Sequence, residues 1–243
     1  MTAILSIAGI LLASFIKGAL GFGFPAVATP LLALFMDVKR AIVILIFPNL
    51  VMDGIQALRK GGFAPTLKRH ALLYIFGIGG TYLGTRLLVL VSSQHALLIL
   101  GGFILVFVAL NASRLALSVP PGWERFLSPP VGLVVGVIGG ITNVPGTPLV
   151  PYFYALGLPK SEFVRSVAIS FFIYKVAQLA SVIQVGLMTG LLFSLSVLAS
   201  GLSLGTFWLG LKVQDRVAQA TFNRAILVFL AFLGAFLVFR ALS

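Results

Sequence analysis

The chain has 243 residues, of which 60% are hydrophobic and 9% are charged. An average soluble protein carries about 25% charged residues, so the composition excludes an ordinary soluble domain and predicts an all-α polytopic membrane protein. The 17 basic residues outnumber the 5 acids, and there is no cysteine. Basic residues gather at the cytoplasmic ends of membrane helices, and no basic run with interleaved aromatic residues indicates nucleic-acid binding.

The first apolar segment, residues 1–36, contains a single charge, Lys17. As one helix it would be about 54 Å long, against about 30 Å for the hydrocarbon core of a bilayer, so the chain has to bend within it. The bend is expected at the glycines of the stretch KGALGFGFPAVATP, residues 17–30. We predict two half-helices, about residues 2–16 and 26–36, with Pro25 in the first turn of the second, where a missing N–H costs nothing.

The rest of the chain follows a plan that is used twice. The first half continues with three apolar spans, residues 41–58, 71–91 and 96–117. The most basic loop of the protein lies between the first two spans, at residues 59–70. The second half has a long uncharged stretch broken at residues 143–148 and three further spans, residues 163–184, 186–211 and 225–239. We predict a first repeat over residues 1–117, a connector over 118–130 and a second repeat over 131–243.

The two broken stretches correspond to each other at a shift of 118 positions, which aligns Gly18 with Gly136 and Gly21 with Gly139. The sequence Thr-Pro-Leu at 29–31 then meets Thr-Pro-Leu at 147–149. Paired apolar segments interrupted by glycine and proline, at matching places in two repeats, mark the binding site of many secondary transporters. We therefore expect the substrate site where the two breaks meet.

The distribution of basic residues distinguishes two topologies. If both broken stretches cross the membrane fully, seven basic residues lie on one side and eight on the other, and the positive-inside rule selects neither. If each stretch dips in and returns, eleven lie on one side and four on the other, namely Lys39, Arg40, Arg86 and Arg240. We therefore predict two inverted-topology repeats, each a re-entrant helix pair plus three transmembrane helices, about eight hydrophobic segments in all, with both termini on the non-cytoplasmic side.

The doubled motif, GALGFGFPAVATPLL at residues 18–32 and GVIGGITNVPGTPLV at 136–150, resembles the TauE/SafE sulfite-exporter-like membrane permeases, as do the repeat length and the total length. The resemblance extends over essentially the whole chain. It implies a transporter of small sulfur-containing anions such as sulfite, thiosulfate or organosulfonates, usually located in the bacterial cytoplasmic (inner) membrane.

The residues independently favour an anion. Half-helices that begin at Pro25 and near Asn143 would aim free backbone N–H groups and positive dipole ends at the centre of the protein. The alternative is that these residues only break the helices and let them pack closely. The predicted substrate-binding residues are Lys17, Gly21, Gly23, Pro25, Thr29, Asn49, Thr142, Asn143, Pro145, Gly146, Thr147, Lys175 and Gln178.

Charged residues inside a membrane are functional by default, because they are costly to insert. Lys17 either contacts the anion or extends its stem to the interface. Lys175 and Gln178, one helical turn apart, form a second polar face. For Asp53 we favour an interfacial ion pair near Arg59 over a role in carrying a coupling proton. The two histidines, His70 and His95, are expected at the interface; their spacing indicates no metal site, and we expect no cofactor.

The sequence thus predicts an exporter of small sulfur-containing anions that works by alternating access. An anion channel, or a permease for another small anion including proton-coupled uptake, is the alternative. No HExxH motif, Gly-x-Ser-x-Gly motif or pair of acids within one span is present, so we expect no enzymatic activity. The expected partners are the anion and the lipid bilayer, and the oligomeric state stays open, with a homodimer among the alternatives.

Overall fold

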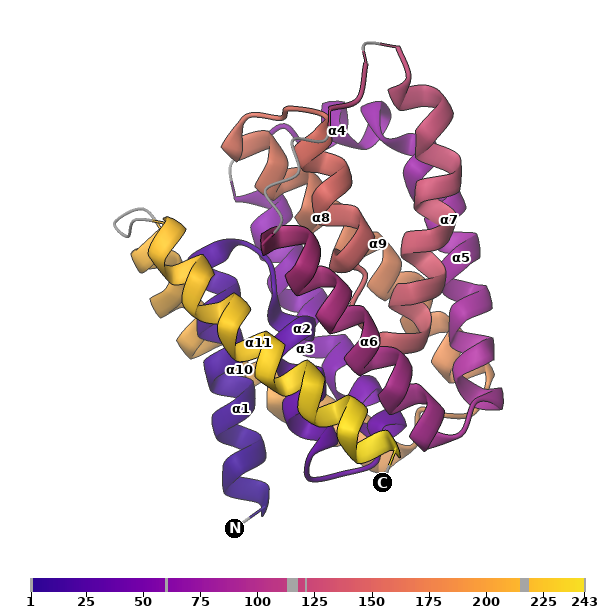
Figure 1. The fold of residues 1–243 in the computed structure, drawn as a ribbon, viewed down its shortest axis with the longest axis vertical. Helices are drawn as coiled ribbons and strands as arrows, with labels where there is room; N and C mark the ends of the chain where they lie inside the picture. Colours follow the sequence, from indigo (N-terminus) through magenta and orange to yellow (C-terminus); the bar gives the residue numbers. More distant parts are fainter. Residues whose placement is uncertain (1, 60, 113–117, 121, 215–218, 243) are drawn as a thin grey trace.

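The computed structural model describes residues 2–59, 61–112, 118–120, 122–214 and 219–242, and within these ranges the chain forms eleven α-helices and no strand (Figure 1). The helices of the first half are α1 Thr2–Leu20, α2 Phe24–Ala33, α3 Val38–Leu58, α4 Phe63–Arg69, α5 Ala71–Leu90 and α6 Ser93–Ala112. Those of the second half are α7 Glu124–Thr142, α8 Gly146–Ala155, α9 Lys160–Gln184, α10 Gly190–Gln214 and α11 Gln219–Leu242.

Six of the described helices, namely α3, α5, α6, α7, α9 and α10, are long and apolar enough to cross a membrane. Helix α2 and the described apolar parts of α1 and α11 are shorter than these six helices, with 10–17 residues each. Large apolar side chains point outward along the bundle, including Leu90 and Phe239, which are 81% and 70% exposed. Such an apolar exterior suits contact with lipid tails, because little of it could be hydrated without cost.

Each of the two broken stretches folds back as a helical hairpin. At the end of α2, the backbone carbonyl of Ala33 accepts a hydrogen bond of 2.8 Å from Arg240, close to the C-terminus. The N- and C-termini lie at the same end of the molecule, the lower end in Figure 1, which we call the termini face. The hairpin of α7 and α8 opens at the opposite end, the α4 face, where Tyr152 of α8 donates to the carbonyl of Glu124 at the start of α7 over 3.4 Å.

Helix α7 packs along α5, and α1 packs along α10, so that each hairpin is held by a helix from the other half of the chain. Glycines make both contacts. A Cβ added at Gly84 of α5 would lie 2.2 Å from the carbonyl oxygen of Val137, and one added at Gly210 of α10 would lie 2.2 Å from that of Phe15. Backbones approach this closely only where small residues face each other, which is how membrane helices gain packing contacts.

We expect Gly84→Ala to destabilise the fold by about 1–3 kcal/mol or more, because the added methyl group has to push α5 away from the α7 backbone. Gly79→Ala on the same helix is the matched control, since a Cβ there meets nothing within 4 Å. Thermal unfolding of the two variants in detergent measures the difference. Equal melting temperatures would show that the α5–α7 contact is looser than described.

Several predicted boundaries were wrong. Helix α1 continues to Leu20, four residues beyond the predicted end, because the chain bends only where Gly21 and Gly23 adopt positive φ angles of 89° and 100°. The basic loop contains an additional short helix, α4. Helix α7 begins at Glu124, inside the predicted connector, and α9 begins at Lys160. The sequence predicts breaks between helices at these charged residues, whereas in α7 and α9 they form the first turns.

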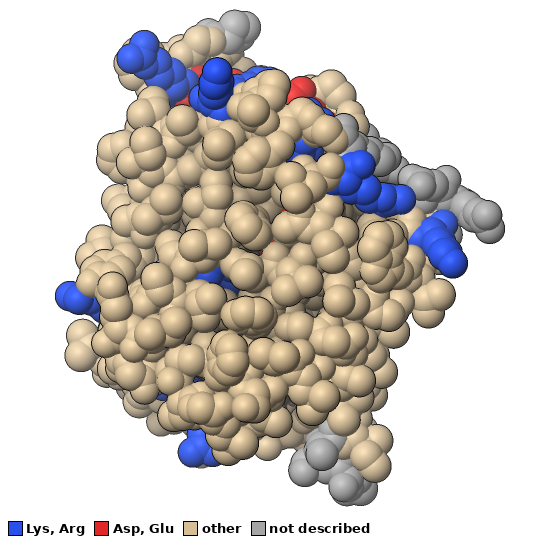
Figure 2. Space-filling model, turned by 180° about the vertical axis from the view of Figure 1, so that it is seen from behind, with Lys and Arg blue, Asp and Glu red and all other residues tan. Residues whose placement is uncertain are grey.

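Basic side chains gather at the α4 face (Figure 2). Arg165 of α9 donates to Thr66 of α4 over 2.9 Å, and Arg59 at the end of α3 donates to Gln214 at the end of α10 over 3.4 Å. At the termini face, Lys39 donates to the carbonyl of Val89 over 3.1 Å. The described basic residues are therefore concentrated at one end of the bundle.

Candidate functional site

The two hairpin turns begin new helices without side-chain caps. Gly23 precedes α2 in a left-handed conformation, and Pro25 occupies its first turn. Helix α8 begins at Gly146 after Pro145, again with no capping side chain. The first N–H groups of a helix have no partner within it and carry its positive dipole end. Both turns therefore offer backbone donors to a negative group.

Asn143 is the one non-glycine residue with a positive φ angle, 68°, among the described residues. It ends α7, and its side chain explains why the conformation persists. Its Nδ2 donates to the hydroxyl of Thr29 on α2 over 2.9 Å, and its Oδ1 accepts from Lys175 on α9. Asparagine tolerates this backbone region better than most residues, and such strain is concentrated at functional sites. Asn143 thus links the two hairpins to α9.

Lys175 is 1% exposed and also donates to Gln178, one turn further along α9. The amide nitrogen of Gln178 faces the end of α7, at 3.3 Å from the carbonyl of Gly139 and 3.4 Å from that of Gly140. The structure thus brings together four of the predicted residues, Thr29, Asn143, Lys175 and Gln178, in one hydrogen-bonded chain.

Lys17 and Asp53 form a fully buried ion pair, with 0% of either side chain exposed. For Lys17 the pair excludes the alternative in which its stem extends to the interface. For Asp53 it corrects the expected ion pair with Arg59, because the partner is Lys17. Asp53 lies in the predicted span, whereas Lys17 lies inside α1 and not in the predicted break. Only the folded chain shows that the two side chains meet in the interior.

The ion pair lies next to the hydrogen-bonded residues around Lys175. The Nζ of Lys17 is 5.6 Å from the ring centroid of Phe171, which precedes Lys175 by one turn of α9. Lys175 lies within electrostatic range of both members of the pair, although its own hydrogen bonds go to Asn143 and Gln178. Two buried lysines thus lie near one buried carboxylate. When both lysines are protonated, the uncompensated buried charge is unfavourable, and a bound anion would offset it.

Unpartnered polar atoms surround the same region. Both amide atoms of Asn49, Oδ2 of Asp53 and the hydroxyl of Thr147 are buried and form no hydrogen bond with the described protein atoms. Most buried polar groups in proteins are satisfied, so each exception calls for an explanation such as a bound guest. Asn49 and Asp53 lie on α3, and Thr147 lies in the first turn of α8.

The remaining predicted residues shape the turns. The hydroxyl of Thr142 donates to the carbonyl of Ile138 over 2.7 Å and accepts from the N–H of Val144 over 3.1 Å. Its hydrogen bonds therefore stabilise the end of α7. A Cβ at Gly146 would lie 3.5 Å from the ring of Phe171, and one at Gly21 would lie 3.0 Å from the amide nitrogen of Gln56.

Two residues at the site, Phe171 and Gln56, were not predicted. An apolar ring in a membrane helix gives no sequence signal. For Gln56 a signal exists: α3 and α9 begin 122 positions apart, and the same shift aligns Asp53 with Lys175 and Gln56 with Gln178. Aligning the starts of these two helices would have identified Gln56 as the counterpart of a predicted site residue.

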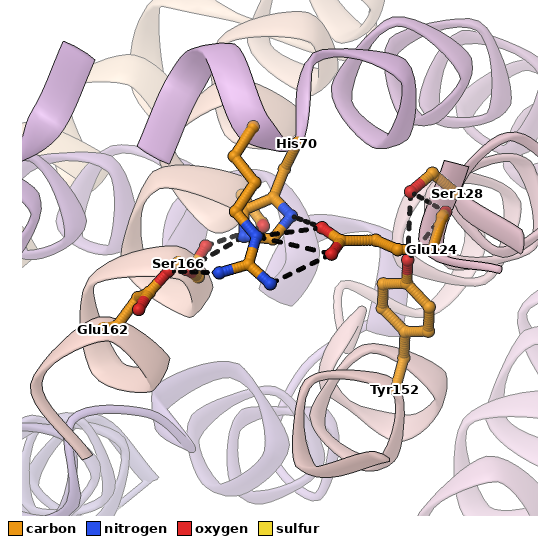
Figure 3. A network of polar contacts seen from close by, with 8 residues as sticks. His70, Glu124, Ser128, Tyr152, Glu162 and Ser166 are labelled. Carbon is orange, nitrogen blue, oxygen red and sulfur yellow. Dashed lines mark hydrogen bonds and ion pairs between the residues drawn. The ribbon is translucent and has the colours of Figure 1, made fainter. Parts of the chain in front are cut away.

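A separate network joins the two halves at the α4 face (Figure 3). Arg69 forms ion pairs of 2.9 Å with Glu124 and 2.7 Å with Glu162. His70, which was expected at an interface, is fully buried, with Nδ1 3.1 Å from a carboxylate oxygen of Glu124 and Nε2 3.4 Å from the hydroxyl of Ser166. The network connects the starts of α5, α7 and α9.

Burial lowers the pKa of His70 below its ordinary value; the charge of Glu124 opposes this effect and that of Arg69 adds to it. The unfolded chain therefore binds a proton more readily than the folded one. Stability should rise with pH between the lowered pKa and about 6.5, and should fall on acidification through that window. We expect His70→Gln to remove this dependence and His95→Gln, at an exposed position, to keep it. Melting temperatures measured from pH 5 to 8 in detergent check this, and identical profiles for wild type and His70→Gln would contradict it.

Comparison with known proteins agrees with this architecture. Residues 6–237 match the family described as "Sulfite exporter TauE/SafE". Neither the comparison with curated proteins nor that with solved structures gives a match. The family match spans nearly the whole chain, and the helices supply the apolar spans of a multi-pass membrane protein. The chain belongs to the TauE/SafE sulfite exporter family.

Proposed function

We propose that this protein is a carrier that exports small sulfur-containing oxyanions, such as sulfite, thiosulfate or organosulfonates, across the bacterial cytoplasmic membrane. The observation that carries the proposal is the burial of two lysines, Lys17 and Lys175, near one buried carboxylate, that of Asp53, which is paired with Lys17. An oxyanion would restore neutrality and accept hydrogen bonds from the ammonium group of Lys175 and from the uncapped starts of α2 and α8. The amide of Asn49 and the hydroxyl of Thr147 would supply further bonds.

We propose alternating access between two inverted repeats as the mechanism. The two hairpins open at opposite faces, and each packs on a helix from the other half. Helices α3 and α9, at equivalent places in the two halves, contribute Asp53 and Lys175 to the same region. Rocking of one half against the other would expose such a central site to each face in turn.

The direction follows from electrostatics. A membrane potential contributes about 2.3 kcal/mol per charge per 100 mV, so a divalent anion leaves a negative-inside cell without a coupling ion. Proton-coupled uptake is the second candidate, because Oδ2 of Asp53 is buried without a partner and is available to a proton. In that case Asp53 would change its charge during the cycle.

Counterflow of radiolabelled sulfite into proteoliposomes tests the proposal, with thiosulfate, sulfate, a sulfonate and acetate as competitors. We expect saturable exchange that sulfur oxyanions inhibit and acetate does not, with no requirement for a pH gradient. A strict requirement for a pH gradient would favour coupled uptake, and a large unsaturable conductance would favour a channel. Absence of exchange with all these anions, from folded protein, would refute the proposed substrate class.

A further inference from the structure

A second group of unpartnered polar atoms lies at the turn between α1 and α2. Gln56 is 5% exposed, and neither atom of its amide has a hydrogen-bond partner among the described residues. A Cβ added at Gly21 would lie 3.0 Å from Nε2 of Gln56 and 3.2 Å from Nε2 of Gln214, so both amides lie against this turn. We call Gly21, Gln56 and Gln214 the Gln56 cluster.

The Gln56 cluster is rich in hydrogen-bond donors. Gln214 accepts from Arg59 through its Oε1 over 3.4 Å, which leaves its amide nitrogen on the side of Gly21. The start of α2 follows directly after the turn and has no side-chain cap. The nearest acid along α3, Asp53, is bound to Lys17. Amide and backbone N–H groups arranged in this way suit an oxyanion, whose oxygens accept several hydrogen bonds at once.

Comparison with the second half shows that the unpartnered state of Gln56 is specific to the first. The equivalent residue, Gln178, is fully engaged, because it accepts from Lys175 and faces the carbonyls of Gly139 and Gly140. At the position equivalent to Lys175 the first half has Asp53, which cannot donate as an ammonium group does. A buried amide without partners is unfavourable, and a transiently bound ligand would offset that cost.

We propose that the Gln56 cluster is a second binding station for the transported oxyanion, which rests on the proposed function and extends it. Gln56 stands one helical turn after Asp53 on α3, toward Arg59 and the basic α4 face. The station therefore lies between the central lysines and that face. It holds the anion through neutral amides and backbone groups, so it binds more weakly than the central site and releases its ligand readily.

Binding stoichiometry tests the second station. Equilibrium binding of radiolabelled sulfite to the purified, folded protein is expected to show two anions per chain for wild type, with unequal affinities. Gln56→Leu should retain only the central site, which binds more tightly. Lys175→Met should lose that central site. Gln56→Glu, which keeps the size but adds a repelling charge, should behave like Gln56→Leu and covers the case in which that variant does not fold. Gln94→Leu, which removes a glutamine that bonds the carbonyl of Ala241 at the termini face, should keep both sites.

The outcomes separate the two proposals. One anion per chain in wild type, unchanged by both Gln56 substitutions and lost in Lys175→Met, would overturn the second station and leave the proposed function standing. Two anions per chain that persist in both Gln56 variants would also overturn it. Binding of no sulfite by folded wild type would overturn the proposed function, and the second station with it.

Discussion

Lys175→Met is expected to lower the rate of sulfite counterflow about 10- to 150-fold. The substitution removes the ammonium group that we place on the anion, and a hydrogen bond to a charged group is worth about 1.5–3 kcal/mol, where about 1.4 kcal/mol corresponds to a factor of ten. It also eliminates the excess positive charge, because Lys17 and Asp53 then neutralise each other. An anion would have to enter a buried region that no longer attracts it. Transport should suffer in both directions.

The matched control is Lys39→Met. Lys39 is a partly exposed lysine at the termini face, where it donates to the carbonyl of Val89. We expect counterflow within about twofold of wild type, since surface ionic contacts contribute little. Wild-type counterflow by Lys175→Met, from protein with an unchanged elution profile, would remove Lys175 from the binding site and contradict the proposed function at its central residue.

Asp53→Leu is expected to destabilise the protein by about 3–5 kcal/mol, because it leaves the fully buried ammonium group of Lys17 without its counterion. The double variant Lys17→Met/Asp53→Leu should recover most of this loss, since replacing a buried ion pair by apolar groups of similar volume is often neutral or stabilising. Chemical denaturation of the three proteins in detergent measures the two differences.

Transport separates the structural from the functional role of this pair. The stable double variant should keep Lys175 and its single positive charge, so it should still bind sulfite while its exchange rate falls. If Asp53 carries a coupling proton instead, the double variant should lose any dependence of uptake on a pH gradient. Equal stability of Asp53→Leu and the double variant would show that Lys17 finds another partner and that the ion pair is not the main contact of either residue.

The structure separates what was predictable at the site from what was not. Lys175 and Gln178 were recognised because polar residues inside an apolar span are costly and therefore informative by themselves. The breaks at Gly21 and Asn143 were recognised because glycine, asparagine and proline interrupt helices locally. The partner of Asp53 was not, because Arg59 is near it in sequence whereas Lys17 is near it only in space. Gln56 was not predicted because the two halves were not aligned at the starts of α3 and α9, and its lack of a partner exists only in the folded chain.

The sequence by itself determined that this is a helical membrane protein with two related halves, two interrupted segments and a TauE/SafE-like pattern. These properties follow from the hydropathy of each segment and the backbone preferences of its residues, which act over one or two helical turns. Only the tertiary structure decided which charges neutralise each other and which amides stay without a partner. Those outcomes depend on how far apart the helices lie, and glycine contacts between segments distant in sequence, such as Gly84 against Val137, set that distance.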